Sequence, residues 1–339
     1  AADIIESDPF VLCSSGMDFA FERVDLIAEY LGLPKDMDSR IAAALIYILK
    51  HNLLNGHTCL PRDKLLDTAY MLLGEISAGE VCIRLTESGQ LREMDIEGRS
   101  FIFLDSMFGY EQRIADRIRL MLSDKPLKPV SGADAEKYID SVEKETSIKY
   151  ERLQRAAIIE ALKNGMLVMT GGPGTGKTTT LNAIISIFEE LGIKTQLAAP
   201  TGRAAKRMTE ITGRDAKTIH RLLEVEFQQG DMPVFRRNYR NPLECDAMII
   251  DEMSMIDAQL FCSLLDALPL GCRLIMVGDA DQLPSVGAGN VLHDIIDSNT
   301  VPVIRLSRVL RQAMQSLSVT NGHAIINGEP MRLDRKDAD

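Results

Sequence analysis

The stretch that decides the fold of this chain is Gly171-Gly172-Pro173-Gly174-Thr175-Gly176-Lys177-Thr178. It follows a short apolar segment, residues 167–170, and precedes a segment with the spacing of a helix, residues 178–191. The glycines let successive backbone N–H groups face one anion, and the helix N-terminus adds a partial positive charge. Lys177 can neutralise the β- and γ-phosphates of a nucleotide, and the Thr178 hydroxyl can bind Mg²⁺. We therefore expect a nucleoside triphosphate site; the alternative is a glycine-rich turn with a surface lysine.

Short apolar segments alternate with helical patterns through the second half of the chain. Each apolar segment is followed by a polar or glycine-rich turn, which is typical of strands joined by crossover helices in an open parallel sheet. Ligands bind such sheets at the carboxyl ends of the strands. The sequence therefore predicts an α/β fold, a parallel sheet with flanking helices. The expected strands are residues 167–170, 195–199, 247–250, 274–277 and 301–306.

Two further strand ends carry side chains suited to phosphate chemistry. The predicted strand over residues 247–250 is followed directly by Asp251 and Glu252. Two carboxylates are costly to bury at such a strand end unless a cation binds them. We expect Asp251 to hold Mg²⁺ through water and Glu252 to orient or deprotonate the attacking water. Gln282, which follows the next predicted strand, is placed to sense a γ-phosphate. The alternative for Asp251 and Glu252 is a capping pair before a helix over residues 256–268. The alternative for Gln282 is a position in an ordinary polar turn.

The first half of the chain has a different pattern. Residues 21–31, 39–54 and 61–73 carry apolar side chains at helical spacing, whereas residues 90–104 alternate as strands do. These patterns predict a mainly helical module with a small β-hairpin, or wing.

A break between the two halves is expected where prolines precede a charged stretch that is poor in apolar residues. We interpret this break as a linker. The predicted domains are a helical N-terminal module (residues 1–125), a linker (126–147), a nucleotide-binding domain (148–330) and a charged tail (331–339).

Composition excludes several classes of protein. The 339 residues include 38 Lys and Arg and 49 Asp and Glu, a net charge of −11, so the chain is not basic overall. Basic residues are concentrated in the segment 200–240, which contains nine Lys or Arg residues and five Asp or Glu residues. None of the six cysteines forms a CxxC pair, which argues against a metal knuckle. No apolar run approaches the roughly 18 residues that a membrane span needs.

The N-terminus is acidic and has no apolar signal segment, so we expect a cytoplasmic protein. The first residue is not Met, and the sequence is therefore expected to begin inside a longer protein or after processing.

Six segments in their order resemble the motifs of RecD-like superfamily 1 DNA helicases, of the exodeoxyribonuclease V alpha-chain type. They are residues 171–178, 200–205 (PTGRAA), 218–223 (TIHRLL), 251–255 (DEMSM), 278–289 and 310–313 (LRQA). Gln154 resembles the glutamine that reads adenine in this family, and residues 56–61 resemble part of its N-terminal helical module. The first residues weakly resemble a helix-hairpin-helix region, with Gly16 at the hairpin turn.

The resemblance implies a P-loop NTPase fold of the RecA-like kind, namely the first motor domain (1A). It implies ATP-driven movement on single-stranded DNA in the 5′ to 3′ direction, with ATP and Mg²⁺ as cofactors. Catalysis is assigned to Lys177, Asp251, Glu252, Gln282 and Arg311, and metal binding to Thr178 and Asp251. The implied ATP contacts are Gln154, Gly172, Pro173, Gly174, Thr175, Gly176, Lys177, Thr178 and Thr179. An ordinary surface arginine remains the alternative for Arg311.

The resemblance also implies a set of DNA contacts at loop tips. These are Pro200, Thr201, Gly202, Arg203, His220, Pro284, Ser285, Val286 and Gly287. Backbone amides, hydroxyls and nearby basic side chains, among them Lys206 and Arg207, suit phosphates without reading bases. A solvated helix face is the alternative for Lys206 and Arg207, and a core histidine is the alternative for His220.

One departure from the family matters. Its members carry a second RecA-like domain, and nothing after Arg311 resembles that domain's motifs. We therefore expect an N-terminal helicase fragment, a monomer that is weakly active or inactive alone, with single-stranded DNA and other recombination or repair subunits as partners. The alternatives are a non-motor nucleotide-binding assembly or regulatory module and, less well supported, a small-molecule kinase without an evident acceptor pocket.

Overall fold

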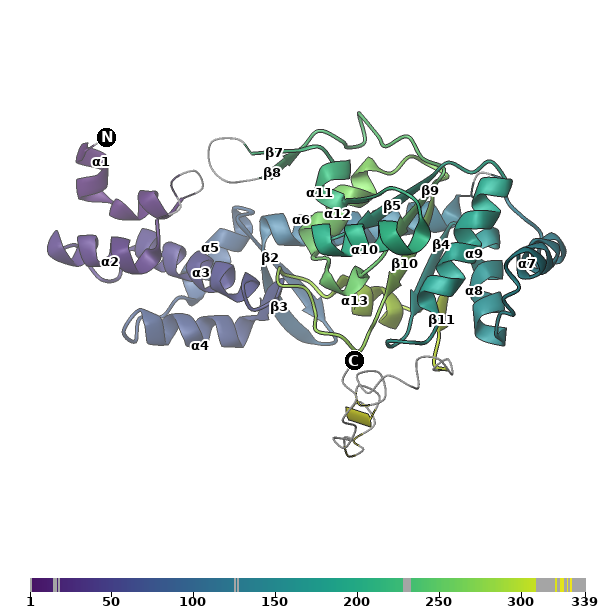
Figure 1. The fold of residues 1–339 in the computed structure, drawn as a ribbon. Coiled ribbons are helices and arrows are strands. Elements are labelled where there is room, and N and C mark those ends of the chain that lie inside the picture. Colours follow the sequence, from purple (N-terminus) through teal and green to yellow (C-terminus); the bar gives the residue numbers. More distant parts are fainter. Residues whose placement is uncertain are drawn as a thin grey trace, which may run out of the picture.

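The chain folds into a helical part and a sheet-centred part, which lie side by side (Figure 1). This is a computed structural model. It describes residues 2–14, 17, 19–124, 126, 128–227 and 233–308, together with residues 321, 324, 325, 328 and 330. Gly16, Arg311, the rest of the segment 310–313 and the tail 331–339 were singled out from the sequence and lie outside the described residues.

The helical part combines short helices with a small antiparallel sheet of order β1-β3-β2. Leu45, Leu65 and Ile102 are completely buried in its core, so helices and sheet share one apolar interior. The three predicted helices and the hairpin are confirmed. The elements are α1 (Ala2–Ser7), η1 (Pro9–Cys13), α2 (Phe21–Tyr30), α3 (Asp38–Leu53), β1 (Cys59–Pro61), α4 (Arg62–Leu72), α5 (Gly79–Glu87), β2 (Leu91–Ile96) and β3 (Arg99–Leu104).

Helix α6 (Asp105–Ser123) joins the two parts. Its apolar side packs against α12 (Ala258–Ala267), and Ile114 and Ile118 belong to the same hydrophobic core as the central strands. The Arg117 guanidinium donates a hydrogen bond to the Leu265 carbonyl at 3.1 Å. Helix α6 is therefore part of the interior of the sheet-centred part, although it follows directly after the wing.

The predicted linker contains a helix, α7 (Gly132–Thr146). Ala135, Ile139 and Val142 are buried against α8 (Arg152–Lys163) and α9 (Lys177–Glu190). The expectation of a linker is wrong over these residues, because all but one of the charged side chains of the helix lie on its outer side, Glu143 being the exception. The apolar positions recur at helical spacing, which the overall charge of the segment concealed.

The sheet of the second part has six parallel strands in the order β11-β4-β10-β9-β5-β6. All five predicted strands are present, which confirms the α/β fold with a parallel sheet, whereas the edge strand β6 was not predicted. Strands β4, β9 and β10 are buried throughout, as expected for a sheet covered on both faces. The bounds are β4 Met166–Thr170, β5 Thr195–Ala199, β6 Ala216–Thr218, β9 Ala247–Ile250, β10 Arg273–Gly278 and β11 Val303–Arg305.

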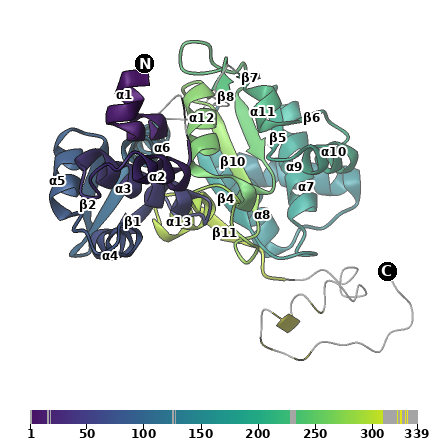
Figure 2. The same ribbon diagram turned by 90° about the vertical axis from the view of Figure 1, so that its left-hand side faces the viewer.

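Alternate residues of the central strands enter two different cores. One core lies under α7, α8 and α9, and the other lies under α6, α12 and α13 (Val291–Asp297). In Figure 2 the N-terminal part lies on one side of the sheet, and α7, α9 and α10 (Gly202–Thr212) lie on the other. The remaining elements are α11 (Ile219–Leu222), the hairpin strands β7 (Val225–Phe227) and β8 (Pro233–Phe235), and the turn η2 (Met253–Met255). In the described part of the chain, no helix is long and apolar enough to cross a membrane.

Candidate nucleotide site

Three chain segments meet at the carboxyl ends of β4, β10 and β9, which are neighbours in the sheet. The glycine-rich loop follows β4, the acid pair follows β9, and Gln282 follows β10. Together with α9 and α10 they enclose a cavity of about 430 Å³. Its lining includes Gly172, Pro173, Gly174, Thr175, Gly176, Lys177, Thr178, Thr179, Arg207, Met208, Ile211, Thr212, Asp251, Glu252 and Gln282.

The loop after β4 depends on glycine for its shape. Gly174 and Gly176 have φ angles of 76° and 87°, which L side chains rarely adopt. A Cβ atom on Gly171 would lie 2.4 Å from the Leu306 carbonyl oxygen. The Thr175 hydroxyl closes the loop by donating to the Gly172 carbonyl at 2.8 Å. The loop thus leads directly into the N-terminus of α9 and lines the cavity.

Lys177, the first residue of α9, reaches back across the loop. Its ammonium donates to the Gly171 carbonyl and, at 3.1 Å, to the Gly172 carbonyl. Burial lowers the pKa of Lys177, while the nearby carboxylates of Asp279 and Asp251 oppose this shift. The amine thus lines the cavity near these acids, and within the described residues it makes no ion pair with them.

Asp251 and Glu252 face the same cavity from the end of β9. Burial raises the pKa of both carboxyl groups, and the charges of Lys177 and Arg207 act against that shift. Glu252 has a φ angle of 56°, a left-handed conformation that is uncommon outside glycine. The Asp251 carboxylate accepts the Glu252 N–H at 2.9 Å. This strained turn aims both acids at the phosphate loop.

The donor set fits Mg²⁺. The Thr178 hydroxyl and the Asp251 carboxylate line one cavity, and both are hard oxygen ligands of the kind this ion prefers. A cation beside Asp251 would also offset the burial that raises its pKa.

Gln282 and Asp279 form the third side of the site. The Gln282 amide donates to the Asp279 carboxylate at 3.5 Å, and Asp279 is almost completely buried. Among the groups that act on the Lys177 amine, Asp279 is the strongest opposing charge. Sequence reasoning missed Asp279, although its position directly after the last residue of β10 could have indicated it.

Gln154 lies near the loop in a second cavity of about 200 Å³. Its amide oxygen accepts the Glu151 N–H at 2.9 Å, and its amide nitrogen donates to the Gly176 carbonyl at 3.3 Å. Gln154 thus ties the start of α8 to the phosphate loop. The lining residues are Glu151, Arg152, Leu153, Gln154, Thr175, Leu306, Ser307 and Arg308.

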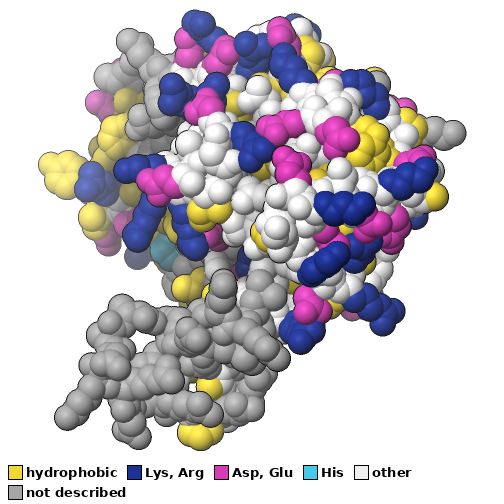
Figure 3. All heavy atoms as spheres, turned by 45° about the vertical axis from the view of Figure 1, so that its right-hand side comes forward, with side chains coloured by type: hydrophobic (Ala, Val, Ile, Leu, Met, Phe, Trp, Pro, Cys, Tyr) yellow, Lys and Arg dark blue, Asp and Glu magenta, His cyan; other side chains and the backbone are white. Residues whose placement is uncertain are grey.

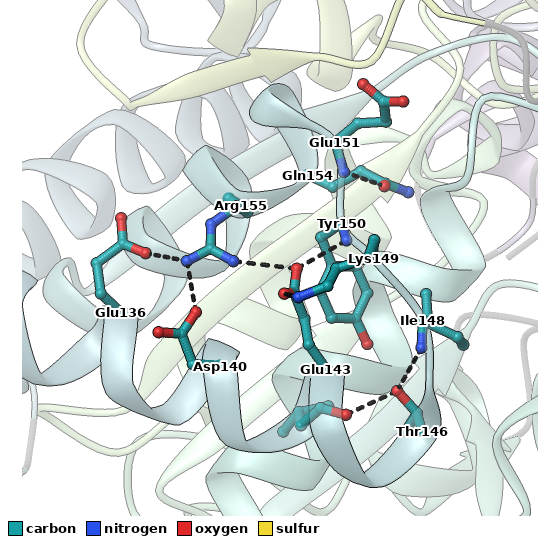
Figure 4. A network of polar contacts seen from close by, with 11 residues as sticks. Glu136, Asp140, Glu143, Thr146, Ile148, Lys149, Tyr150, Glu151, Gln154 and Arg155 are labelled. Carbon is teal, nitrogen blue, oxygen red and sulfur yellow. Dashed lines mark hydrogen bonds and ion pairs between the residues drawn. The ribbon is translucent and has the colours of Figure 1, made fainter.

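A polar network holds the segment that leads to Gln154 (Figure 4). Glu143 on α7 is buried and accepts from the Lys149 ammonium at 2.7 Å, the Tyr150 N–H at 2.9 Å and the Arg155 guanidinium at 3.0 Å. The hydrogen bond from Lys149 is the largest reason why the pKa of Glu143 is lowered. Helix α7 therefore anchors the turn before α8, a positioning role that the linker interpretation did not allow.

The predicted DNA contacts lie outside the nucleotide cavity. Thr201 caps α10 by accepting the Ala204 N–H at 3.2 Å, and Pro200, Gly202 and Arg203 stand beside it, with Arg203 exposed. His220 is half-buried, with its ring 6.1 Å from that of Phe235.

The other predicted DNA-contacting loop, Pro284 to Gly287, follows β10. Ser285 is buried and donates to the Gly287 and Gly289 carbonyls at 2.8 and 2.9 Å, whereas Val286 is 89% exposed. On the face of the molecule that Figure 3 shows, Lys and Arg side chains are interspersed with Asp and Glu and form no continuous basic stripe.

Lys206 and Arg207, which the sequence placed in one group, lie on different sides of α10. The Lys206 ammonium lies 3.9 Å from the Glu210 carboxylate on the outside of α10, whereas Arg207 lines the nucleotide cavity. The described residues contain no cluster of three or more His, Cys, Asp or Glu that could hold a metal.

The chain is similar to several helicases, and the matches cover different shares of its length. It is 33% identical to the ATP-dependent RecD2 DNA helicase of Deinococcus radiodurans over 97% of the chain and 46% of that protein. It is 35% identical to the RecBCD enzyme subunit RecD of Mycolicibacterium smegmatis over 58% of the chain and 37% of that protein. The chain therefore spans less than half the length of these relatives. The Pif1 helicase structure from Candida albicans is 24% identical over 50% of this chain and 44% of that one; its TM-score of 0.36 adds nothing to the assignment.

A parallel sheet with this loop and acid pair at the carboxyl ends of two strands, one strand apart, defines a P-loop NTPase domain. Residues 154–288 match the family model described as an AAA domain, and residues 1–59 match the HHH domain of the ATP-dependent RecD2 DNA helicase. The chain belongs to the RecD-like helicases and corresponds to the N-terminal portion of such a protein.

Proposed function

We propose that this chain binds Mg-ATP and forms the first motor domain of an ATP-dependent helicase that moves 5′ to 3′ on single-stranded DNA. The observation that supports this best is the meeting of Lys177, Asp251 and Glu252 around one cavity, at the carboxyl ends of β4 and β9, which flank β10. The family membership supports the DNA-dependent part of the proposal.

Each group of the site has a role in this proposal. The loop amides and the Lys177 ammonium bind the phosphates, while Thr178 and Asp251 hold Mg²⁺, which supplies charge neutralisation. Glu252 orients the attacking water and accepts its proton, and Gln282 contacts the γ-phosphate. The cavity beside Gln154 has room for the adenine, and residues 172–179 line the path of the phosphates.

DNA is proposed to contact the tips of two loops, residues 200–203 and 284–287, together with His220. Both loops follow strands of the same sheet as the nucleotide site, so a shift there can be transmitted to ATP. Arg311 is proposed to complete the charge around the γ-phosphate, as the family resemblance implies. The described residues contain one parallel sheet of this kind, so we expect slow hydrolysis by this chain alone and no unwinding.

The proposal is tested first by nucleotide binding. Titration of the chain with fluorescent Mg-ATP should give saturable binding, and Lys177→Ala should weaken it by about 100-fold, because one or two charge-assisted contacts are lost. Lys206→Ala, a lysine on the outer side of α10, serves as the matched control and should bind normally. Equal binding by the wild type and Lys177→Ala would contradict the assignment of the site.

The DNA-dependent part requires a second measurement. ATP turnover of the protein carrying this chain should rise on addition of single-stranded DNA, and DNA affinity should fall with salt at a slope near −0.7 for each phosphate contact. Tight Mg-ATP binding without DNA stimulation or salt-dependent DNA affinity would instead favour a non-motor nucleotide-binding assembly module.

A further inference from the structure

Arg207 faces the nucleotide site although the sequence grouped it with the DNA-contacting residues. It lies on α10, and it lines the cavity together with Met208, Ile211 and Thr212, which occupy the same side of that helix. The opposite wall is formed by the phosphate loop and by the first turns of α9. The side of α10 that carries Arg207 therefore faces the phosphate loop.

The charge of Arg207 acts on the groups that surround the end of a bound triphosphate. It opposes the positive charge of Lys177 and favours the ionised forms of Asp251 and Glu252, as the shifts of their pKa values show. Among the described residues, Arg207 has no carboxylate within ion-pair distance, whereas Lys206 beside it pairs with Glu210. The guanidinium is thus available to an anion in the cavity.

The positive charge of Arg207 offsets negative charge on the other residues of the cavity lining. Lys177 with the two acids leaves a net charge of −1 on the cavity lining, and Arg207 brings the lining to zero. The buried Asp279, which acts on Lys177 from behind the lining, adds one more negative charge. Mg-ATP adds two further negative charges, so without Arg207 the lining would repel the ligand more strongly. The loop amides and the α9 N-terminus suit the α- and β-phosphates, and Arg207 would add to Lys177 a second cation at the γ-phosphate, from the α10 side of the cavity. A planar guanidinium binds phosphate oxygens in pairs.

We propose that Arg207 binds the γ-phosphate of the nucleotide and not DNA, and that it makes the site prefer ATP to ADP. This inference rests on the proposed nucleotide site, and it adds a residue from α10 that the family resemblance did not assign to it.

The test compares ATP and ADP affinities in matched variants. Competition of Mg-ATPγS and Mg-ADP against a fluorescent nucleotide is measured for the wild type, Arg207→Ala, Arg207→Lys and Lys206→Ala. We expect Arg207→Ala to weaken ATPγS about 10- to 100-fold, the value of a lost charge-assisted hydrogen bond, and to weaken ADP less than about threefold. Arg207→Lys should recover part of the difference, and Lys206→Ala should resemble the wild type. Circular dichroism melting checks that each variant is folded.

Two outcomes would overturn the inference. One is an equal effect of Arg207→Ala on ATPγS and ADP, whether a loss in both or in neither. The other is a loss of affinity for a fluorescent oligothymidylate, with nucleotide affinity unchanged, which would return Arg207 to the DNA-contacting group. The proposed function fails separately: if Lys177→Ala binds both nucleotides as the wild type does, the cavity is not the nucleotide site at all.

Discussion

A buried charge in the helical part has a charged partner, whereas the charged groups of the nucleotide cavity do not pair with one another within the described residues. Arg40 in α3 is buried, and its guanidinium binds both oxygens of Asp25 at 2.6 and 2.9 Å and the Lys35 carbonyl at 2.8 Å. Lys177, Asp251 and Glu252 are half-buried, and within the described residues they make no ion pair with one another. Removing one partner of a buried charge pair costs stability, whereas a set of charges without mutual pairing is suited to bind a charged ligand.

Among the variants that test this comparison, Glu252→Gln is expected to have the largest effect, and the effect is on ATP turnover. It should lower the DNA-stimulated ATP turnover of the protein carrying this chain by about 10²- to 10⁴-fold, because the group that accepts the proton of the attacking water is lost. Mg-ATP affinity should change little, since the phosphate loop and Asp251 remain. Phosphate release and nucleotide titration measure the two quantities; turnover that stays within threefold of the wild type would remove Glu252 from its role.

A smaller effect, on stability alone, is expected for Arg40→Ala. It should lower the free energy of unfolding by about 3 kcal/mol, because Asp25 and a buried carbonyl lose their partner. Urea denaturation measures the loss, and Mg-ATP affinity of the folded variant should equal that of the wild type. The exposed pair Arg119–Asp116 offers a control: Arg119→Ala should cost well under 1 kcal/mol. A large loss of nucleotide affinity in Arg40→Ala would show that the two kinds of buried charge are not separate.

The smallest effect concerns Glu111, on α6 where the two parts meet. Burial, followed by the charge of Asp294, raises the pKa of Glu111, although a hydrogen bond with Thr58 acts the other way. The folded state then disfavours the ionised form, so stability falls as pH rises from the ordinary value of about 4.3 through the raised folded value.

Glu111→Gln should therefore be more stable than the wild type at pH 8 by less than about 1 kcal/mol, and the difference should shrink towards pH 5. Urea midpoints at the two pH values measure it. A stabilisation that is equal at both pH values would show that ionisation of Glu111 is not its cause.

Much of the fold was predictable because the central strands are continuous apolar runs that end in polar turns. Strand β6, Ala216-Lys217-Thr218, was missed because it lies at an edge, is only half-buried and carries no apolar run. Helix α7 was missed because its outer charges outnumber its buried side chains. In both cases the pattern depends on neighbours in space that the local sequence does not reveal.

The candidate site was predictable at its strand ends and not beyond them. The rule that parallel strands carry ligands at their carboxyl ends brings Lys177, Asp251 and Gln282 to one edge. Whether Asp279 reaches Lys177, or which side of α10 carries Arg207, depends on the order of strands and the rotation of a helix. Neither follows from spacing, so one residue was missed and the other was grouped with DNA contacts.

The packing of α6 has a practical consequence for anyone who wishes to study the ATP-binding half by itself. A truncation that starts at residue 126 would strip Ile114 and Ile118 from the interior and leave the apolar side of α12 open to water and to aggregation. Starting instead at Asp105, where α6 begins, keeps Ile114 and Ile118 in that interior and removes only the edge contacts of Leu53 and Leu104 with it. The working border between the two halves thus lies some twenty residues earlier than the prolines suggested.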